Sequence, residues 1–61
     1  MFKKGDKVIM HTCDEANHYN GQVWTCKTDE FITGKGKYKQ SLVFLDGFSG
    51  SFLAKYLRKS N

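Results

Sequence analysis

Residues 43–59 have the sequence VFLDGFSGSFLAKYLRK, a hydrophobic run followed by an Asp-Gly turn, a second short hydrophobic run and a leucine-containing end. Because Asp-Gly between β-forming residues is a strong hairpin signal, this stretch predicts a strand over residues 39–46 and a short strand over residues 51–53. Residues 54–59 are too few for a stable α-helix. We therefore expect a single 3₁₀ turn at Ala54–Tyr56 and a last strand at Leu57–Lys59.

The N-terminal half shows period-two alternation of apolar and polar residues rather than a helical stripe, and proline is absent from the chain. Residues 7–12, KVIMHT, predict a first strand with Val8 and Met10 on one face. Residues 21–27, GQVWTCK, predict a second strand in which Val23 points inward. Residues 28–40 are either a long loop or, preferably, an extended hairpin with its tip at residues 34–36.

The length of 61 residues allows one domain, residues 1–61, with one small core. Five short strands in such a chain favour a closed all-β barrel, since closure removes exposed strand edges. No apolar run of about 18 residues exists, so we expect no membrane-spanning helix. Two cysteines without a secretory signal predict a cytoplasmic protein with free thiols.

The stretch FKKGDKVIM (2–10), followed by NGQVWTC (20–26), resembles the start of KOW-type and other SH3-like barrels, where Gly-Asp-x-Val precedes a loop and then Gly-x-Val. Residues 43–59 are similar to the closing part of the same barrels, and the stretches together cover more than half of the chain. The resemblance implies a small five-stranded SH3-like barrel with one 3₁₀ turn before the last strand. The barrels of photosystem I subunit IV and of small prophage-encoded proteins are also similar, and some of these dock on other proteins, so the fold does not choose a function. The matching positions are Gly5, Asp6, Val8, Gly21, Val23, Val43, Leu45, Phe52 and Leu57.

Residues 11–26, HTCDEANHYNGQVWTC, contain both histidines and both cysteines of the chain. Zinc sites usually take cysteines in close pairs, and Cys13 and Cys26 are too far apart in sequence for such a pair, so we expect no metal. A three-ligand site of His11, Cys13 and His18 is the alternative. Neither a thiolate-stabilising environment nor an oxyanion site is evident, so we predict no enzyme and no cofactor. In the SH3-like resemblance Cys26 replaces a core aliphatic residue, which implies a buried thiol.

The basic residues concentrate in the second half. Residues 1–34 hold four lysines against five acids, a net charge of minus one, whereas residues 35–61 hold six basic residues against one acid, a net of plus five. Clustered cations attract phosphates, and KGKYKQ interleaves them with an aromatic ring. These lysines either bind an anion or only solubilise the chain and protect sheet edges, and that alternative stays open. Among the functional hypotheses we slightly favour a nucleic-acid binder over a protein-docking module. The candidate nucleic-acid-binding residues are Lys35, Lys37, Tyr38, Lys39, Lys55, Arg58 and Lys59.

The aromatic residues support a second hypothesis, a protein-docking module such as a phage-encoded modulator of a host protein. Nine aromatic residues exceed what a small core needs, and tyrosine and tryptophan are frequent interface anchors. Acids at Asp14 and Glu15 would repel a polyanion beside this surface. Trp24 is either such an anchor or a core residue, and we expect Phe31 and Phe48 to be structural. The expected core is Val8, Met10, Val23, Cys26, Ile32, Val43, Leu45, Phe52 and Leu57, and the candidate docking residues are Tyr19, Trp24, Phe44 and Tyr56.

Overall fold

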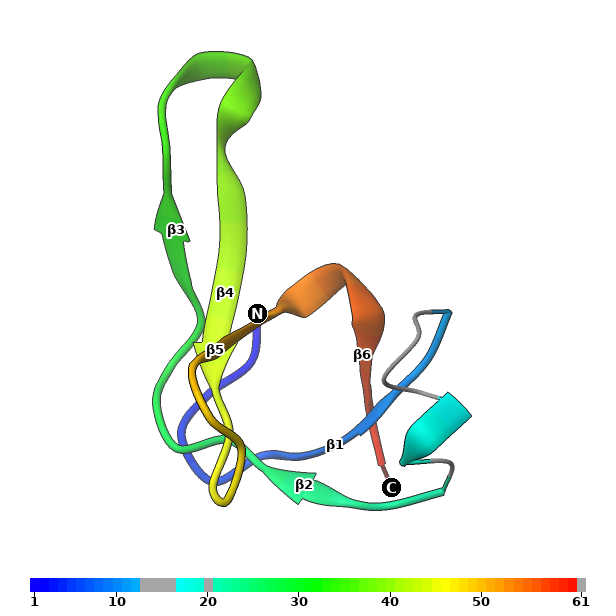
Figure 1. Ribbon diagram of the computed structural model, residues 1–61. Helices are drawn as coiled ribbons and strands as arrows, with labels where there is room; N and C mark the ends of the chain where they lie inside the picture. Colours follow the sequence, from blue (N-terminus) through cyan, green and yellow to red (C-terminus); the bar gives the residue numbers. More distant parts are fainter. Residues whose placement is uncertain (13–16, 20, 61) are drawn as a thin grey trace.

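A computed structural model describes residues 1–12, 17–19 and 21–60, which form two three-stranded antiparallel sheets (Figure 1). One sheet has the strand order β2-β1-β6 and the other the order β3-β4-β5. The strands are β1 (Lys7–Met10), β2 (Trp24–Thr25), β3 (Phe31–Thr33), β4 (Gln40–Phe44), β5 (Ser51–Leu53) and β6 (Leu57–Lys59). Two 3₁₀ turns accompany them, η1 (Gly36–Tyr38) and η2 (Ala54–Tyr56).

The all-β prediction is confirmed, but the five-stranded closed barrel is wrong. The described residues form six strands, because β3 pairs with β4 as a separate strand. The two sheets meet at an isolated antiparallel bridge between Cys26 and Leu45 and are not closed into a barrel. On the other side, η2 carries the chain from β5 of one sheet into β6 of the other. There the sheets are connected by the 3₁₀ turn of the chain and not by hydrogen bonds between paired strands.

The C-terminal elements have the predicted bounds, namely β5, η2 and β6. The first strand is shorter than predicted, since Thr12 has a positive φ of 51° and the His11 N–H donates to the Tyr56 carbonyl outside the ladder (2.8 Å). The preferred hairpin over residues 28–40 is also confirmed. Its tip includes η1, and Gly34 enters it with a φ of +91°, where a side chain would collide with the Tyr38 carbonyl oxygen.

The core lies between the two sheets and corrects the expected orientation of the second strand. Val8 pairs with Trp24, and directly paired residues share a sheet face, so Trp24 points inward with Val8. Trp24 is 6% exposed, whereas its neighbour Val23 is 50% exposed. Ile32, also expected in the core, is 57% exposed because it lies on the hairpin beyond the core. The core residues are Val8, Met10, Trp24, Cys26, Val43, Leu45, Phe52 and Leu57.

An aromatic cluster surrounds Trp24. Tyr19 and Phe48 meet its indole edge-on at ring-centroid distances of 5.2 and 5.5 Å, and Phe48 meets Phe52 in the same way at 5.4 Å. Tyr19 and Phe48 are half-buried against the core, so the expectation that Phe48 is structural is confirmed. Such T-shaped pairs add to the stabilisation from burial. In the part of the chain that the structure describes, no helix is both long enough and apolar enough to cross a bilayer.

Candidate functional site

The tip of the β3–β4 hairpin presents three lysines and one tyrosine to solvent. Lys35, Lys37 and Lys39 are all exposed, and the Tyr38 ring is 73% exposed. η1 fixes the turn, since the Tyr38 N–H donates to the Lys35 carbonyl (3.0 Å). The Lys37 Nζ lies 5.4 Å from the centroid of the Tyr38 ring, within cation–π range. The tip of the β3–β4 hairpin projects away from the rest of the molecule (Figure 1).

A small hollow joins the base of the tip to η2. Lys39, Gln40 and Ser41 of the hairpin and Leu53 and Lys55 of the β5–η2 segment line it, and its volume is about 220 Å³. Lys39 and Lys55 are sixteen positions apart in the sequence, and the fold brings them to one concave surface. Two cations at the rim of one hollow are a suitable arrangement for holding an anion.

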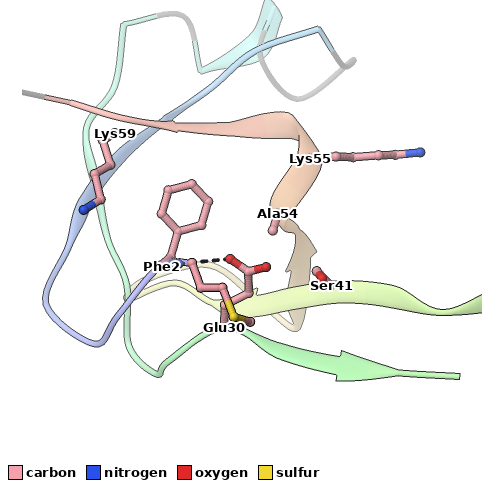
Figure 2. A pocket seen from close by; sticks show the side chains of 7 residues that line it. Phe2, Glu30, Ser41, Ala54, Lys55 and Lys59 are labelled. Carbon is pink, nitrogen blue, oxygen red and sulfur yellow. Dashed lines mark hydrogen bonds between the residues drawn. The ribbon is translucent and has the colours of Figure 1, made fainter.

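A second, larger hollow of about 460 Å³ continues from the first, with Ser41 and Lys55 lining both. Figure 2 shows Lys55 and Lys59 at opposite ends of it, with Phe2 and Glu30 between them. The Phe2 N–H donates to Glu30 Oε1 (3.0 Å), which ties the N-terminal segment to the start of the hairpin. We call Lys39, Lys55 and Lys59, which line these two hollows, the basic strip.

The two ends of the basic strip differ in charge. Lys59 Nζ lies 3.6 Å from Asp6 Oδ2, a partly exposed ion pair. The Lys3 N–H donates to the same carboxylate (2.9 Å), and this hydrogen bond, followed by the charge of Lys59, lowers the pKa of Asp6. Asp6 therefore remains charged at neutral pH and offsets part of the positive potential of Lys59. The Lys39 and Lys55 end lacks such an acid among the residues that line its hollow.

The structure does not place every predicted basic residue on the strip. Arg58 precedes Lys59 in β6 and pairs with Ile9 of β1, and consecutive strand residues point to opposite faces. Arg58 is therefore directed to the other side of the sheet from Lys59. Lys35 and Lys37 lie on the tip, beyond the residues that line the two hollows.

The four candidate docking residues do not form one exposed surface. Trp24, expected on the outer face of the second strand, is in the core, so that part of the prediction is wrong. Tyr19 and Tyr56 are half-buried and pack against the core. Phe44 is 39% exposed and lies on the face of β4 opposite to the buried Val43. An anchor must be accessible to a partner, so Trp24 does not fit a docking role, whereas Phe44 and the exposed part of Tyr56 remain accessible.

The β3-β4-β5 sheet carries an apolar surface that was not predicted from the sequence. The register pairs Phe31 with Leu42 and Leu42 with Leu53, so these three side chains form a row across the sheet. Phe44 lies on the same face of β4, and its ring stacks on Phe31 at 5.6 Å with an interplanar angle of 23°. We call Phe31, Leu42, Phe44 and Leu53 the outer apolar face. The alternation of Leu42 and Phe44 was visible in the sequence, but their pairing with Phe31 was not.

The histidines and cysteines do not assemble into a site among the described residues. No three His, Cys, Asp or Glu side chains come together there, and Cys13 of the alternative metal site lies outside the described residues. His11 Nδ1 lies 3.0 Å from Thr12 Oγ1. The Cys26 side chain is buried (1% exposed), and burial, followed by the charges of Asp6 and Glu30, raises the pKa of its thiol. Cys26 therefore acts as a small core hydrophobe.

Comparison of the chain with protein-family models, with curated proteins and with solved structures gives no significant match. Among the described residues, the basic strip with the hairpin tip and the outer apolar face can both face a ligand.

Proposed function

We propose that this chain is a small non-enzymatic binding module that holds the phosphate backbone of a nucleic acid along the basic strip and the hairpin tip. The observation that carries the proposal is the convergence of Lys39 and Lys55, from separate elements, on one hollow beside the exposed Tyr38. Neutralising phosphates with lysines releases condensed counterions, which favours binding at low salt. The exposed ring of Tyr38 offers a surface for stacking a base.

The expected binding is electrostatic and tolerant of sequence. The described lysines have flexible side chains without a rigid fork of donors, so they contact phosphates better than they distinguish bases. Non-specific binding of this kind has dissociation constants of about 1–100 μM at physiological salt. The net charge of plus five on residues 35–61 supports the same interpretation.

We infer that the fold is an open relative of SH3-like barrels. The inference is supported by the Gly5-Asp6-x-Val8 start, by the antiparallel pairing of β1 with both β2 and β6, and by η2 directly before β6. A cytoplasmic location belongs to the same proposal, and the buried free thiol of Cys26 is compatible with it.

The test is a titration of isotope-labelled protein with a short single strand and a matching duplex, at low and at physiological salt. We expect amide shifts at residues 35–39, 55 and 59 that fade as salt rises. Lys39→Gln combined with Lys55→Gln should lower the salt slope, log Kd against log salt, by about 1.4–1.8, because each phosphate contact contributes about 0.7–0.9.

The matched control is Lys4→Gln combined with Lys27→Gln, which removes the same charge from exposed lysines that line neither hollow. This control should lose less affinity than the strip variant. Equal losses in the two double variants would assign the binding to overall charge, and an absence of shifts at low salt would reject the proposal.

A second candidate, docking of a protein partner, is favoured by one observation. Leu42, Leu53, Phe48 and Tyr56 help to line an apolar hollow of about 310 Å³ beside β5. An apolar side chain of a partner protein, such as the host target of a phage-encoded modulator, would fit there. Tyr56→Ala should weaken such a complex while Lys39→Gln leaves it unchanged, which is the reverse of the pattern expected for a nucleic acid.

A further inference from the structure

We propose that the nucleic acid is single-stranded, and that its bases lie on the outer apolar face while its phosphates contact Lys39 and Lys55. This inference depends on the proposed function and specifies its ligand class. It follows from the hollow at the edge of the β3-β4-β5 sheet, which Lys39 and Lys55 line together with Leu53 of the outer apolar face and Ser41 of the opposite face.

The outer apolar face has the geometry of a stacking platform. Phe31, Leu42 and Leu53 are aligned across three strands by the register, opposite to the core face that contains Val43 and Phe52. Phe31 supports Phe44 from the side through their stacked contact, so the exposed part of the Phe44 ring is held in place by a neighbour. A ring fixed in this way can stack with a base at a small cost in conformational entropy.

The lysines border this platform. Leu53, at one end of the apolar row, lines the same hollow as Lys39 and Lys55. Gln40, which pairs with Thr33 beyond the row, connects the platform to the tip that contains Tyr38. The charge therefore lies along the edge of the apolar surface, which is the arrangement required by a ligand with a charged backbone on one side and flat apolar groups on the other.

A single strand fits this combination better than a duplex does. The flat faces of bases in a duplex are stacked on one another, so a duplex offers the protein only its phosphates and base edges. An unpaired strand exposes each base to aromatic side chains, and each such stacking contact contributes about 1–3 kcal/mol. A duplex would contact the lysines through its phosphates and would leave Phe44 and Leu53 exposed to solvent.

The spacing of the two rings sets the length of the ligand. Tyr38 at the end of η1 and Phe44 at the end of β4 are six positions apart, which separates their Cα atoms by at most about 20 Å at the rise of an extended chain. A strand that contacts both rings must therefore span several nucleotides, which is within the range of sites seen on other small β-sheet folds.

The experiment compares a fluorescein-labelled mixed-sequence DNA strand of about twelve nucleotides with a hairpin duplex of the same sequence, at low salt. We expect the single strand to bind more tightly, and Phe44→Ala to weaken it by about tenfold while changing duplex binding less than twofold. Tyr38→Ala should act in the same direction. Ile32→Ala is the matched control, because Ile32 is an exposed apolar residue of β3 whose pairing with Ser41 places it on the other face of the sheet.

Thermal melts verify that the variants are folded. Phe44→Leu is a second variant that keeps an apolar side chain in contact with Phe31 but removes the aromatic ring. The inference is wrong if strand and duplex bind equally, or if Phe44→Ala and Phe44→Leu both retain full affinity for the single strand. In those cases the loss of binding by the Lys39 and Lys55 double variant would still support the proposed function. If neither probe binds at low salt, both the proposed function and the inference fail.

Discussion

Replacing Trp24 with alanine is expected to remove a large part of the stability of the protein. Truncation of a buried tryptophan or phenylalanine to alanine costs about 3–5 kcal/mol. At about 0.05–0.15 kcal/mol per residue, a chain of 61 residues has a free energy of unfolding of about 3–9 kcal/mol. Trp24 also contacts Tyr19 and Phe48 edge-on, so its loss would leave two half-buried rings without their central partner. The expected loss is therefore at least about a third of the free energy of unfolding, and at the lower end of the stability range the variant would be unfolded at 25 °C.

Urea unfolding followed by far-UV circular dichroism measures this loss without a tryptophan signal, and amide spectra report whether the two sheets persist. Trp24→Phe keeps an aromatic ring in the cluster and should lose clearly less stability than Trp24→Ala. Ile32→Ala is the control from the exposed side of the hairpin, and surface substitutions of this kind change stability by about 0.5 kcal/mol or less.

A Trp24→Ala protein whose free energy of unfolding stays within about 0.5 kcal/mol of the original would refute the argument. The indole would then make no stabilising contacts, and Trp24 would again be a candidate anchor for a protein partner. A large loss in Trp24→Ala together with an equal loss in Ile32→Ala would instead indicate that the sheets respond to any truncation, and the special position of Trp24 would not be supported.

Two further predictions concern the hairpin tip and the acid at the end of the basic strip. Gly34→Ala should lower the free energy of unfolding by about 1–3 kcal/mol, because the φ of +91° disfavours a side chain and the new Cβ meets the Tyr38 carbonyl. Urea unfolding should show a smaller loss for Gly36→Ala, because a Cβ at Gly36 has open space around it. The pKa of Asp6 is lower in the folded state than its ordinary value of 3.8, so ionised Asp6 stabilises the fold at pH values above 3.8. This stabilisation is lost as the pH falls through the folded-state pKa of Asp6. Thermal melts of Asp6→Asn should therefore depend less on pH in this acid range, and an unchanged pH dependence would contradict the role of Asp6.

The C-terminal elements could be predicted from the sequence because local chemistry determines them. The turn after Leu45 contains Asp46 and Gly47, and Gly47 adopts the positive φ (83°) that favours glycine in tight turns. The segment after β5 is too short for an α-helix, so the 3₁₀ turn and the strand that follows it have few alternatives. Each of these features depends on residues that are neighbours in the chain.

The orientation of Trp24 could not be predicted in the same way. Alternation in GQVWTCK shows that Val23 and Trp24 face opposite sides, but the side that faces the core depends on the partner strand. The pairing of Val8 with Trp24 decides this, and it joins residues that are sixteen positions apart. A β-branched valine and a large aromatic ring are both good strand residues, so composition did not distinguish them.

Closure of the sheets and the grouping of the basic residues are likewise long-range properties. Nothing in the sequence of β3 shows that it pairs with β4 alone, and the open arrangement follows from that pairing. Charge counting identified Lys39, Lys55 and Arg58 as equivalent candidates. The fold brings Lys39 and Lys55 to one hollow and directs Arg58 to the far side of β6 from Lys59, a distinction that requires the register of β6 with β1.

In the second strand Trp24 faces the core and Val23 faces solvent, and this exchange also affects the function that can be proposed. With Trp24 in the core, the exposed aromatic rings belong to β4 and the hairpin tip, where Phe44 and Tyr38 lie on the same hairpin as Lys39. The sequence had assigned Tyr38 to the nucleic-acid hypothesis together with the lysines, and Phe44 to the competing hypothesis of a protein partner. Because the structure combines them on one sheet, a ligand with both phosphates and unpaired bases accounts for both features, whereas a duplex accounts only for the lysines.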